Sequence, residues 1–112
     1  MNTSKATAAF AAIAHENRLA LYRLLVKRGP GGLPAGVIAG RLGVAPSSLT
    51  FHLQALQRAG LLRRRREGRQ LIYSADFAAM NSLVGFLTDH CCVEDDGAGE
   101  DCCAPVRRGR VA

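Results

Sequence analysis

The stretch that most constrains the fold is residues 44–74, which is typical of one helix followed by a two-stranded basic hairpin. Between Pro46 and Gly60, leucines recur at three- and four-residue spacing, and this predicts an amphipathic helix that starts at the proline and ends before the glycine. Four consecutive arginines then lead into Glu67-Gly68, a tight-turn dipeptide, and residues 69–73 return as the second strand. The stretch therefore predicts a helix with a basic wing.

The face of this helix opposite the leucines carries groups that can read DNA. Hydroxyl and amide side chains bond base edges in a major groove, and guanidinium groups contact phosphates. The expected DNA-binding residues are Ser47, Ser48, Thr50, Phe51, His52, Gln54 and Arg58 of the helix, and Arg64, Arg65, Arg66 and Arg69 of the hairpin. His52 has two interpretations, since its imidazole can contact phosphate or simply be packed or solvated. A serine-rich face or an arginine run alone is usually only solvated surface, but their combination favours DNA binding.

A second short helix is predicted just upstream, at Pro34–Leu42, and Gly43 breaks the chain between the two. A short helix, a glycine turn and a recognition helix make a helix-turn-helix. Further helices are expected at residues 3–13 and 17–28, and a last one after Asp76. The predicted fold is mainly α with a small β-hairpin, a winged helix-turn-helix.

The first and last helices predict how subunits assemble. The first helix is expected to be capped by Thr3 or Ser4 and to bury Ala6, Phe10 and Ile13. The apolar stripe of the last helix is Phe77, Met80, Leu83, Val84 and Leu87, and it continues to Cys91. A single 112-residue subunit has too little interior for both sets, so pairing in a homodimer is expected to bury them.

The charge distribution supports a polyanionic partner. Residues 1–88 hold twelve Lys and Arg against three acidic residues, a net charge of +9, whereas six of the nine acidic residues lie between positions 89 and 101. This change in composition predicts a DNA-binding and dimerisation domain at residues 1–92 and a flexible, cysteine-containing tail at residues 93–112. The length is short for a soluble enzyme, and no enzymatic activity is predicted.

No stretch of the sequence is long enough to span a bilayer. Residues 6–14 superficially resemble a secretion signal, but a single lysine precedes them and the chain runs on into another amphipathic segment. A cytoplasmic location is therefore expected. In that compartment, four cysteines are expected to be thiols or metal ligands rather than structural disulfides.

The order of helices, together with HENRLALYRLL, RLGVAPSSLTFHLQALQRAGLL and REGRQLIYS, resembles the ArsR/SmtB family of bacterial metal- and arsenic-responsive repressors. The resemblance covers residues 6–92. It implies a winged-helix homodimer in which the first and last helices pair across a two-fold axis. Two recognition helices would then enter successive major grooves of operator DNA about 34 Å apart. Ala45 departs from the family, which often places a serine cap there.

The cysteines are the residues that distinguish between effectors. The helix before the turn contains no cysteine, and Asp89-His90 lacks the remaining pair of a last-helix zinc site. Cys91 and Cys92, followed after nine residues by Cys102 and Cys103, are similar to the thiolates of arsenical sensors in this family. Three thiolates suit trivalent arsenic or antimony. The resemblance therefore implies a repressor of an arsenic-resistance operon that is released by As(III) or Sb(III).

The sequence also allows other hypotheses. Four tetrahedral thiolates would suit zinc or cadmium, and zinc is the less favoured effector. Exposed vicinal thiols also oxidise readily, so a redox-sensing repressor of the same fold is an alternative. The spacing from Cys102 to Arg108 matches a phosphatase-type loop, but the sequence predicts no strand and helix to flank it, and we interpret the match as coincidence.

Overall fold

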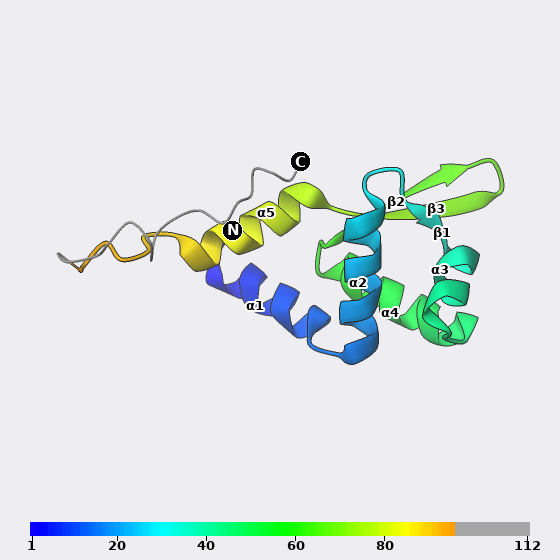
Figure 1. Cartoon of the computed structure of the whole chain (residues 1–112), viewed down its shortest axis with the longest axis horizontal. Helices are drawn as coiled ribbons and strands as arrows, with labels where there is room; N and C mark the ends of the chain where they lie inside the picture. Colours follow the sequence, from blue (N-terminus) through cyan, green and yellow to red (C-terminus); the bar gives the residue numbers. More distant parts are fainter. Residues whose placement is uncertain (96–112) are drawn as a thin grey trace.

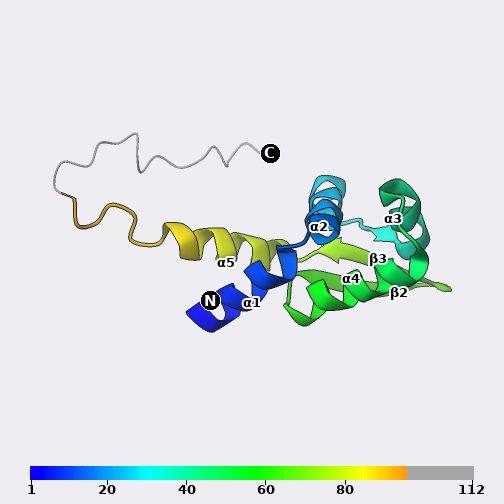
Figure 2. The ribbon, with the colours of Figure 1, turned by 90° about the horizontal axis from the view of Figure 1, so that it is seen from below.

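The computed structural model describes residues 1–95 of the chain (Figure 1). Its elements are α1 (Thr3–Ile13), α2 (Glu16–Arg28), β1 (Leu33–Pro34), α3 (Ala35–Leu42), α4 (Pro46–Arg58), β2 (Leu62–Glu67), β3 (Gln70–Ala75) and α5 (Phe77–Thr88). This order confirms the predicted mainly helical fold with a small hairpin. The hairpin and the far end of α5 lie at opposite ends of the molecule, and α1 lies beside α5 (Figures 1 and 2).

The sheet contains one strand more than the sequence predicted. Its antiparallel order is β1-β3-β2, and the two-residue strand β1 pairs Leu33 with Tyr73. Gly32, directly before β1, has a φ of +70°, and a Cβ at this position would lie 2.5 Å from the Tyr73 carbonyl oxygen. Only glycine fits this close approach, which brings the turn after α2 against the wing.

The helix caps are partly as predicted. Asp76 caps α5, because its carboxylate accepts a hydrogen bond from the Ala79 amide at 3.0 Å. The predicted cap of α1 is wrong: the Asn2 side chain accepts from the Lys5 amide at 2.8 Å, one residue before Thr3. At the start of α4, Ala45 makes no side-chain cap, and the proline at the first helical position needs no amide partner.

The buried face of α1 also differs from the prediction. Ala6, Ala9 and Ala12 are buried, whereas Phe10 is 40% exposed and Ile13 is only partly buried. Alanine side chains let helix backbones approach closely, and α1 packs against α2, α4 and α5 along this row. The phenylalanine therefore faces away from the core of the subunit.

The apolar stripe of α5 divides between two environments. Leu83 is buried in the core of its own subunit, with 6% exposure, and Phe77 and Met80 pack partly against that core. Val84 and Leu87 are 56% and 65% exposed. Only part of the stripe is therefore left for a second subunit to cover, since Leu83 already has a place in the subunit interior.

The end of α5 corrects a further prediction. The helix ends at Thr88, so Cys91 does not continue the helical stripe. The Cys91 amide instead donates to the Thr88 carbonyl at 3.0 Å, and His90 and Cys92 adopt positive φ angles of 61° and 60°. Between residues 1 and 95, none of the helices has the length and hydropathy to cross a membrane.

Candidate nucleic-acid interface

The recognition helix α4 has an apolar face and, opposite it, a polar face. Leu49, Leu53 and Leu56 are buried in the core, with exposures of 2% or less. The side chains that the sequence assigned to the opposite face are all exposed: Ser47, Ser48, Thr50, Phe51, Gln54 and Arg58. The three- and four-residue spacing of the leucines fixes this orientation, so the polar row is free to meet another molecule.

The turn between α3 and α4 fixes the angle of the recognition helix. Gly43 takes a left-handed conformation, and its amide donates to the Ala39 carbonyl at 2.9 Å. The next amide, of Val44, donates to the same carbonyl at 3.2 Å. Ile38, with 0% exposure, anchors α3 in the core. These contacts form the helix-turn-helix that the sequence predicted.

A polar groove separates the recognition helix from the wing. Residues from α4 and from both hairpin strands or their turn face it: Thr50, Gln54, Gln57, Arg64, Arg69 and Gln70. Pro34 of β1 and Ala35 and Gly36 at the start of α3 also line it. Gln57 and Gln70 were missed by the sequence prediction, although Gln57 follows Gln54 by one helical turn on the same side. Amides and guanidinium groups around one groove suit the phosphates and base edges of DNA.

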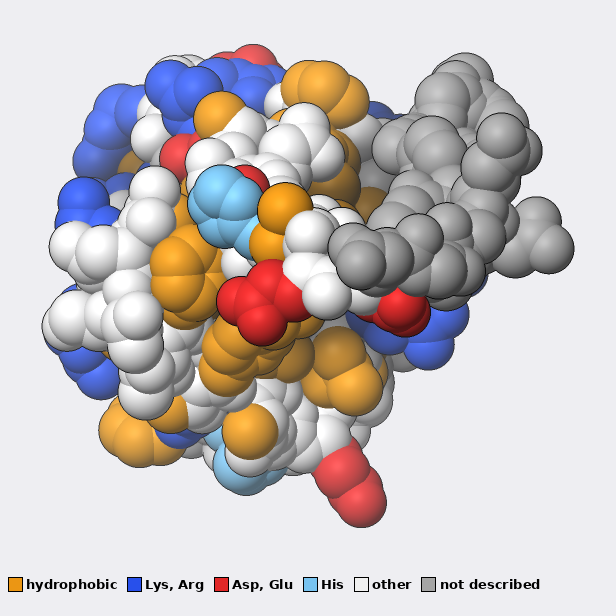
Figure 3. Space-filling view, turned by 90° about the vertical axis from the view of Figure 1, so that its left-hand side faces the viewer, with side chains coloured by type: hydrophobic (Ala, Val, Ile, Leu, Met, Phe, Trp, Pro, Cys, Tyr) orange, Lys and Arg blue, Asp and Glu red, His pale blue; other side chains and the backbone are white. Residues whose placement is uncertain are grey.

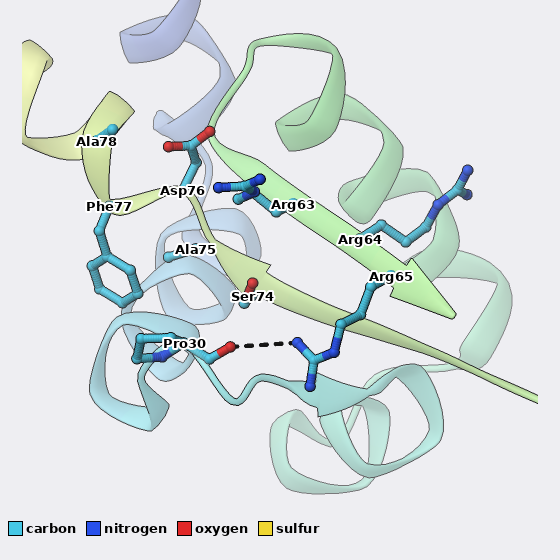
Figure 4. A pocket seen from close by; sticks show the side chains of 9 residues that line it. All are labelled: Pro30, Arg63, Arg64, Arg65, Ser74, Ala75, Asp76, Phe77 and Ala78. Atoms are coloured by element: carbon cyan, nitrogen blue, oxygen red, sulfur yellow. Dashed lines mark hydrogen bonds between the residues drawn. The ribbon is translucent and has the colours of Figure 1, made fainter. Parts of the chain in front are cut away.

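Arg65 differs from the other wing arginines because its guanidinium group binds backbone carbonyls and a carboxylate of the protein itself. Its Nη2 donates to the Gly31 carbonyl at 2.9 Å. Its Nη1 donates to the Pro30 carbonyl at 3.4 Å, the bond drawn in Figure 4. Its Nε forms an ion pair with Glu67 at 2.8 Å. Arg65 therefore fastens strand β2 to the glycine-rich turn after α2. Arg64, on the other face of the strand, points away from this cluster (Figure 4).

His52 adopts the packed alternative that the sequence left open. Its side chain is only 7% exposed, and its Nδ1 accepts a hydrogen bond from Arg18 Nε at 3.2 Å. The His15 ring lies 4.8 Å away, between centroids. Burial lowers the pKa of His52 below its usual 6.5, and the neighbouring His15 and Arg18 lower it further. This side chain connects the start of α2 to α4 and is turned away from the exposed face.

The predicted thiolate site is described only in part. The Sγ atoms of Cys91 and Cys92 lie 3.5 Å apart, a hydrogen-bond distance rather than a disulfide bond. Cys102 and Cys103 lie outside the described residues. Within residues 1–95, no three His, Cys, Asp or Glu side chains are grouped so as to hold a metal ion. The end of the helix at Thr88 is what lets two consecutive cysteines bring their sulfur atoms together.

Comparison with known proteins identifies the family. A family model described as a helix-turn-helix domain matches residues 13–65. The structure of an ArsR-like transcriptional regulator from Rhodococcus sp. RHA1 is similar with a TM-score of 0.66 and 31% identity, over 75% of this chain and 76% of that one. The chain belongs to the ArsR family of winged-helix transcriptional regulators. The predicted family and fold are thereby confirmed.

Other relatives extend the comparison. The transcriptional activator HlyU of Vibrio cholerae is 29% identical over 77% of each chain. The homodimeric winged helix-turn-helix DNA-binding domain of Mb0332 from Mycobacterium bovis has a TM-score of 0.61 at 26% identity, covering 86% of this chain and 89% of that one. A possible transcriptional regulator for arsenical resistance has a TM-score of 0.60 at 26% identity, over 69% and 77% of the two chains. These relatives are regulators and not enzymes, in agreement with the sequence prediction.

Proposed function

We propose that this ArsR-family regulator is a homodimeric repressor of an arsenic-resistance operon, and that trivalent arsenic or antimony releases it from operator DNA. The observation that carries the DNA-binding part is the groove between α4 and the wing, where exposed amides, hydroxyls and arginines of both elements face the same space. The thiol pair after α5 carries the effector part. A cytoplasmic location, where the operator is, belongs to the same proposal.

The DNA-binding part predicts a strong dependence on salt. The exposed arginines of α4 and the wing include Arg58, Arg64, Arg66 and Arg69. If a dimer neutralises about six to ten phosphates, its affinity for an operator duplex falls on the order of 10³ to 10⁵-fold between 50 and 200 mM salt. Titrating the full chain against its own upstream DNA at several salt concentrations measures this slope, and a flat response would contradict DNA binding.

The exposed apolar side chains of α1 and α5 support a homodimer. Phe10, Val84 and Leu87 lie at the surface although each is large and apolar. Figure 3 faces the end of the molecule that carries α1 and α5, where hydrophobic side chains reach the surface and most Lys and Arg side chains in view lie toward the rim. A second copy would cover such a surface by an isologous contact. The homodimeric Mb0332 domain has the same fold.

The thiols support the proposed effector. Cys91 and Cys92 have sulfur atoms 3.5 Å apart, a spacing from which both can bind one soft ion. The third thiolate in this proposal comes from Cys102 or Cys103. Each new arsenic–sulfur bond would replace one hydroxyl group of arsenous acid, which leaves as water with the thiol proton. Residues 1–92 then act as the DNA-binding and dimerisation domain, and residues 93–112 supply the closing ligand.

Effector binding releases DNA if the effector-bound protein has a lower affinity for operator DNA than the effector-free protein. The cysteine pair follows α5, and α5 contacts α1, which in turn contacts the recognition helix α4. If the ligand-bound state holds operator DNA less tightly by about 1 to 3 kcal/mol, repression weakens by about 5 to 150-fold. Arsenic binding at the end of α5 would act by changing how α5 and α1 pack against the rest of the domain.

The test compares effectors on the purified full chain bound to its upstream DNA. Arsenite is expected to release the DNA, and X-ray absorption is expected to show three sulfur neighbours around arsenic. Cys91→Ser and Cys92→Ser are each expected to stay on DNA in arsenite. A single replacement of Cys102 or Cys103 should have a mild effect and the double replacement a severe one, because either thiol can supply the third bond. Full arsenite response in the Cys91→Ser/Cys92→Ser double variant would refute the site.

Two other effectors have their own outcomes in the same experiment. Release by zinc or cadmium, with four sulfur neighbours around the metal, would identify a tetrahedral thiolate sensor. Release by peroxide without any metal would identify a redox sensor, which the close approach of the Cys91 and Cys92 sulfur atoms also supports. Either result replaces the effector but keeps the winged-helix repressor.

A further inference from the structure

Phe51 is a large apolar side chain on the otherwise polar face of the recognition helix. It is 58% exposed, while the leucines on the other face of α4 already fill the core. Ser47 lies four residues before it and Gln54 three residues after it, so the three side chains form one row along the helix. The ring therefore contributes little to the interior of the subunit and lies where the helix would meet DNA.

The surroundings of Phe51 hold its ring in place. The Arg18 guanidinium carbon lies 5.4 Å from the ring centroid, a cation–π contact, and Arg18 Nε is fixed by its hydrogen bond to His52. The His52 ring meets Phe51 edge-on, with centroids 5.8 Å apart. Since His52 is buried, these contacts connect an exposed ring to a fixed support. The ring is thus presented in a defined orientation.

The chemistry of the major groove determines what such a ring can recognise. Each base pair presents hydrogen-bond donors and acceptors there, and thymine adds an apolar group, its C5-methyl. We propose that Phe51 reads a thymine C5-methyl group in each operator half-site and so selects a T·A base pair at that position. This inference rests on the proposed binding of operator DNA. It assigns Phe51 a specificity role that hydroxyls, amides and guanidinium groups cannot perform.

A protein partner fits the same surface less well. Phe51 is a single ring between polar side chains, whereas apolar patches that bind proteins are typically several hundred Å² in area. Arg18 lies over the ring, and Arg58 lies seven residues further along the same helix, so both favour a polyanion instead. Both observations point to a contact inside the groove of a nucleic acid.

Uracil substitution tests the proposal, because deoxyuridine pairs like thymidine and lacks only the methyl group. A duplex that the full chain binds is first selected from a random library, and its thymines are then replaced by deoxyuridine one position at a time. At one symmetric pair of positions we expect affinity to fall about fourfold for each half-site, or about 15-fold for both, from the transfer free energy of one methyl group. At the other thymines the change should be small.

The Phe51→Ala variant completes the cycle, and Leu19→Ala is the matched control. Leu19 is also an exposed apolar residue, 46% exposed, but it lies on α2. We expect Phe51→Ala to bind the thymine and uracil duplexes equally and to keep the wild-type salt dependence on random DNA. Leu19→Ala should retain the full preference for thymine.

Several results would overturn the proposal. Equal binding of thymine and uracil duplexes by the wild-type chain would overturn it while leaving DNA binding intact, and so would an unchanged methyl preference in Phe51→Ala. The wild-type comparison does not depend on how any variant folds. Failure to bind any duplex in a salt-sensitive manner would instead refute the proposed function itself, so the two failures are distinguishable.

Discussion

Replacing Arg65 with alanine should separate the structural arginine of the wing from those that face DNA. The substitution removes donors to the Gly31 and Pro30 carbonyls and the ion pair with Glu67. Hydrogen bonds from charged donors contribute about 1.5 to 3 kcal/mol, but the Arg65 side chain is 44% exposed, so solvent competes for them. We expect a loss of about 1 kcal/mol of folding free energy, or about 4 to 8 °C in Tm.

Arg64→Ala is the matched control, since it changes the preceding residue of the same strand. Arg64 is exposed, and no hydrogen bond or ion pair to it is seen within residues 1–95. Its removal should leave the free energy of unfolding in urea within about 0.5 kcal/mol of wild type. It should instead lower the slope of log affinity against log salt by about 1 for each subunit.

The two assays, urea denaturation and salt-dependent DNA binding, are run on both variants. Arg65→Ala should change mainly stability, and Arg64→Ala mainly the salt slope. If Arg65→Ala is as stable as wild type and loses as much salt slope as Arg64→Ala, the Arg65 guanidinium serves phosphate rather than the turn after α2. Its three contacts within the protein would then contribute nothing to stability.

Other substitutions test the fold and the assembly. Gly32→Ala should destabilise the domain by about 2 to 4 kcal/mol in urea denaturation, because its Cβ would lie 2.5 Å from a backbone oxygen and its φ is positive. Gly40→Ala is the control, since it lies inside α3 and its Cβ would meet nothing within 4 Å. It should stabilise the domain by up to about 1 kcal/mol. Because the pKa of His52 is lowered in the folded state, its contribution to stability is present above pH 6.5 and is lost as pH falls toward the lowered pKa. The His52→Gln variant keeps an acceptor for Arg18 but does not titrate. It should therefore lose less stability than wild type between pH 7.5 and pH 5. Leu87→Glu should give a folded monomer in sedimentation analysis, and a stable dimer of this variant would place the interface elsewhere.

The sequence predicted those parts of the fold that depend on local periodicity. The leucine spacing of α4 and the Asp76 cap of α5 are both local signals, and both are confirmed. The two-residue strand β1 has no such signal, because its conformation follows from pairing with β3 forty residues away. On α1 the prediction of a buried Ala6 is confirmed, but Ala9 and Ala12 were missed, since Phe10 dominates the apolar pattern while close helix packing selects the alanines.

In the candidate site, too, the sequence predicted local features but not long-range contacts. The exposed side chains of α4 followed from the helical period alone, whereas the burial of His52 did not. The distant partners of His52 and Arg65 did not, because Arg18 and the turn at residues 30–31 are 34 or 35 positions away in the chain. Such contacts depend on how complete elements pack, and no window of the sequence contains them. The interaction of Arg18 with Phe51 is of the same kind.

The alanine row of α1 affects how a displacement of α5 is accommodated in the subunit. Ala6, Ala9 and Ala12 are buried on the helix that contacts both α5 and α4. Leucine or methionine can absorb a small displacement by changing rotamer, but alanine has no side-chain torsion that repositions heavy atoms. On the α1 side of these contacts no rotamer change can absorb a shift of α5. Any such adjustment must therefore come from the longer side chains of α5, such as Met80 and Leu83.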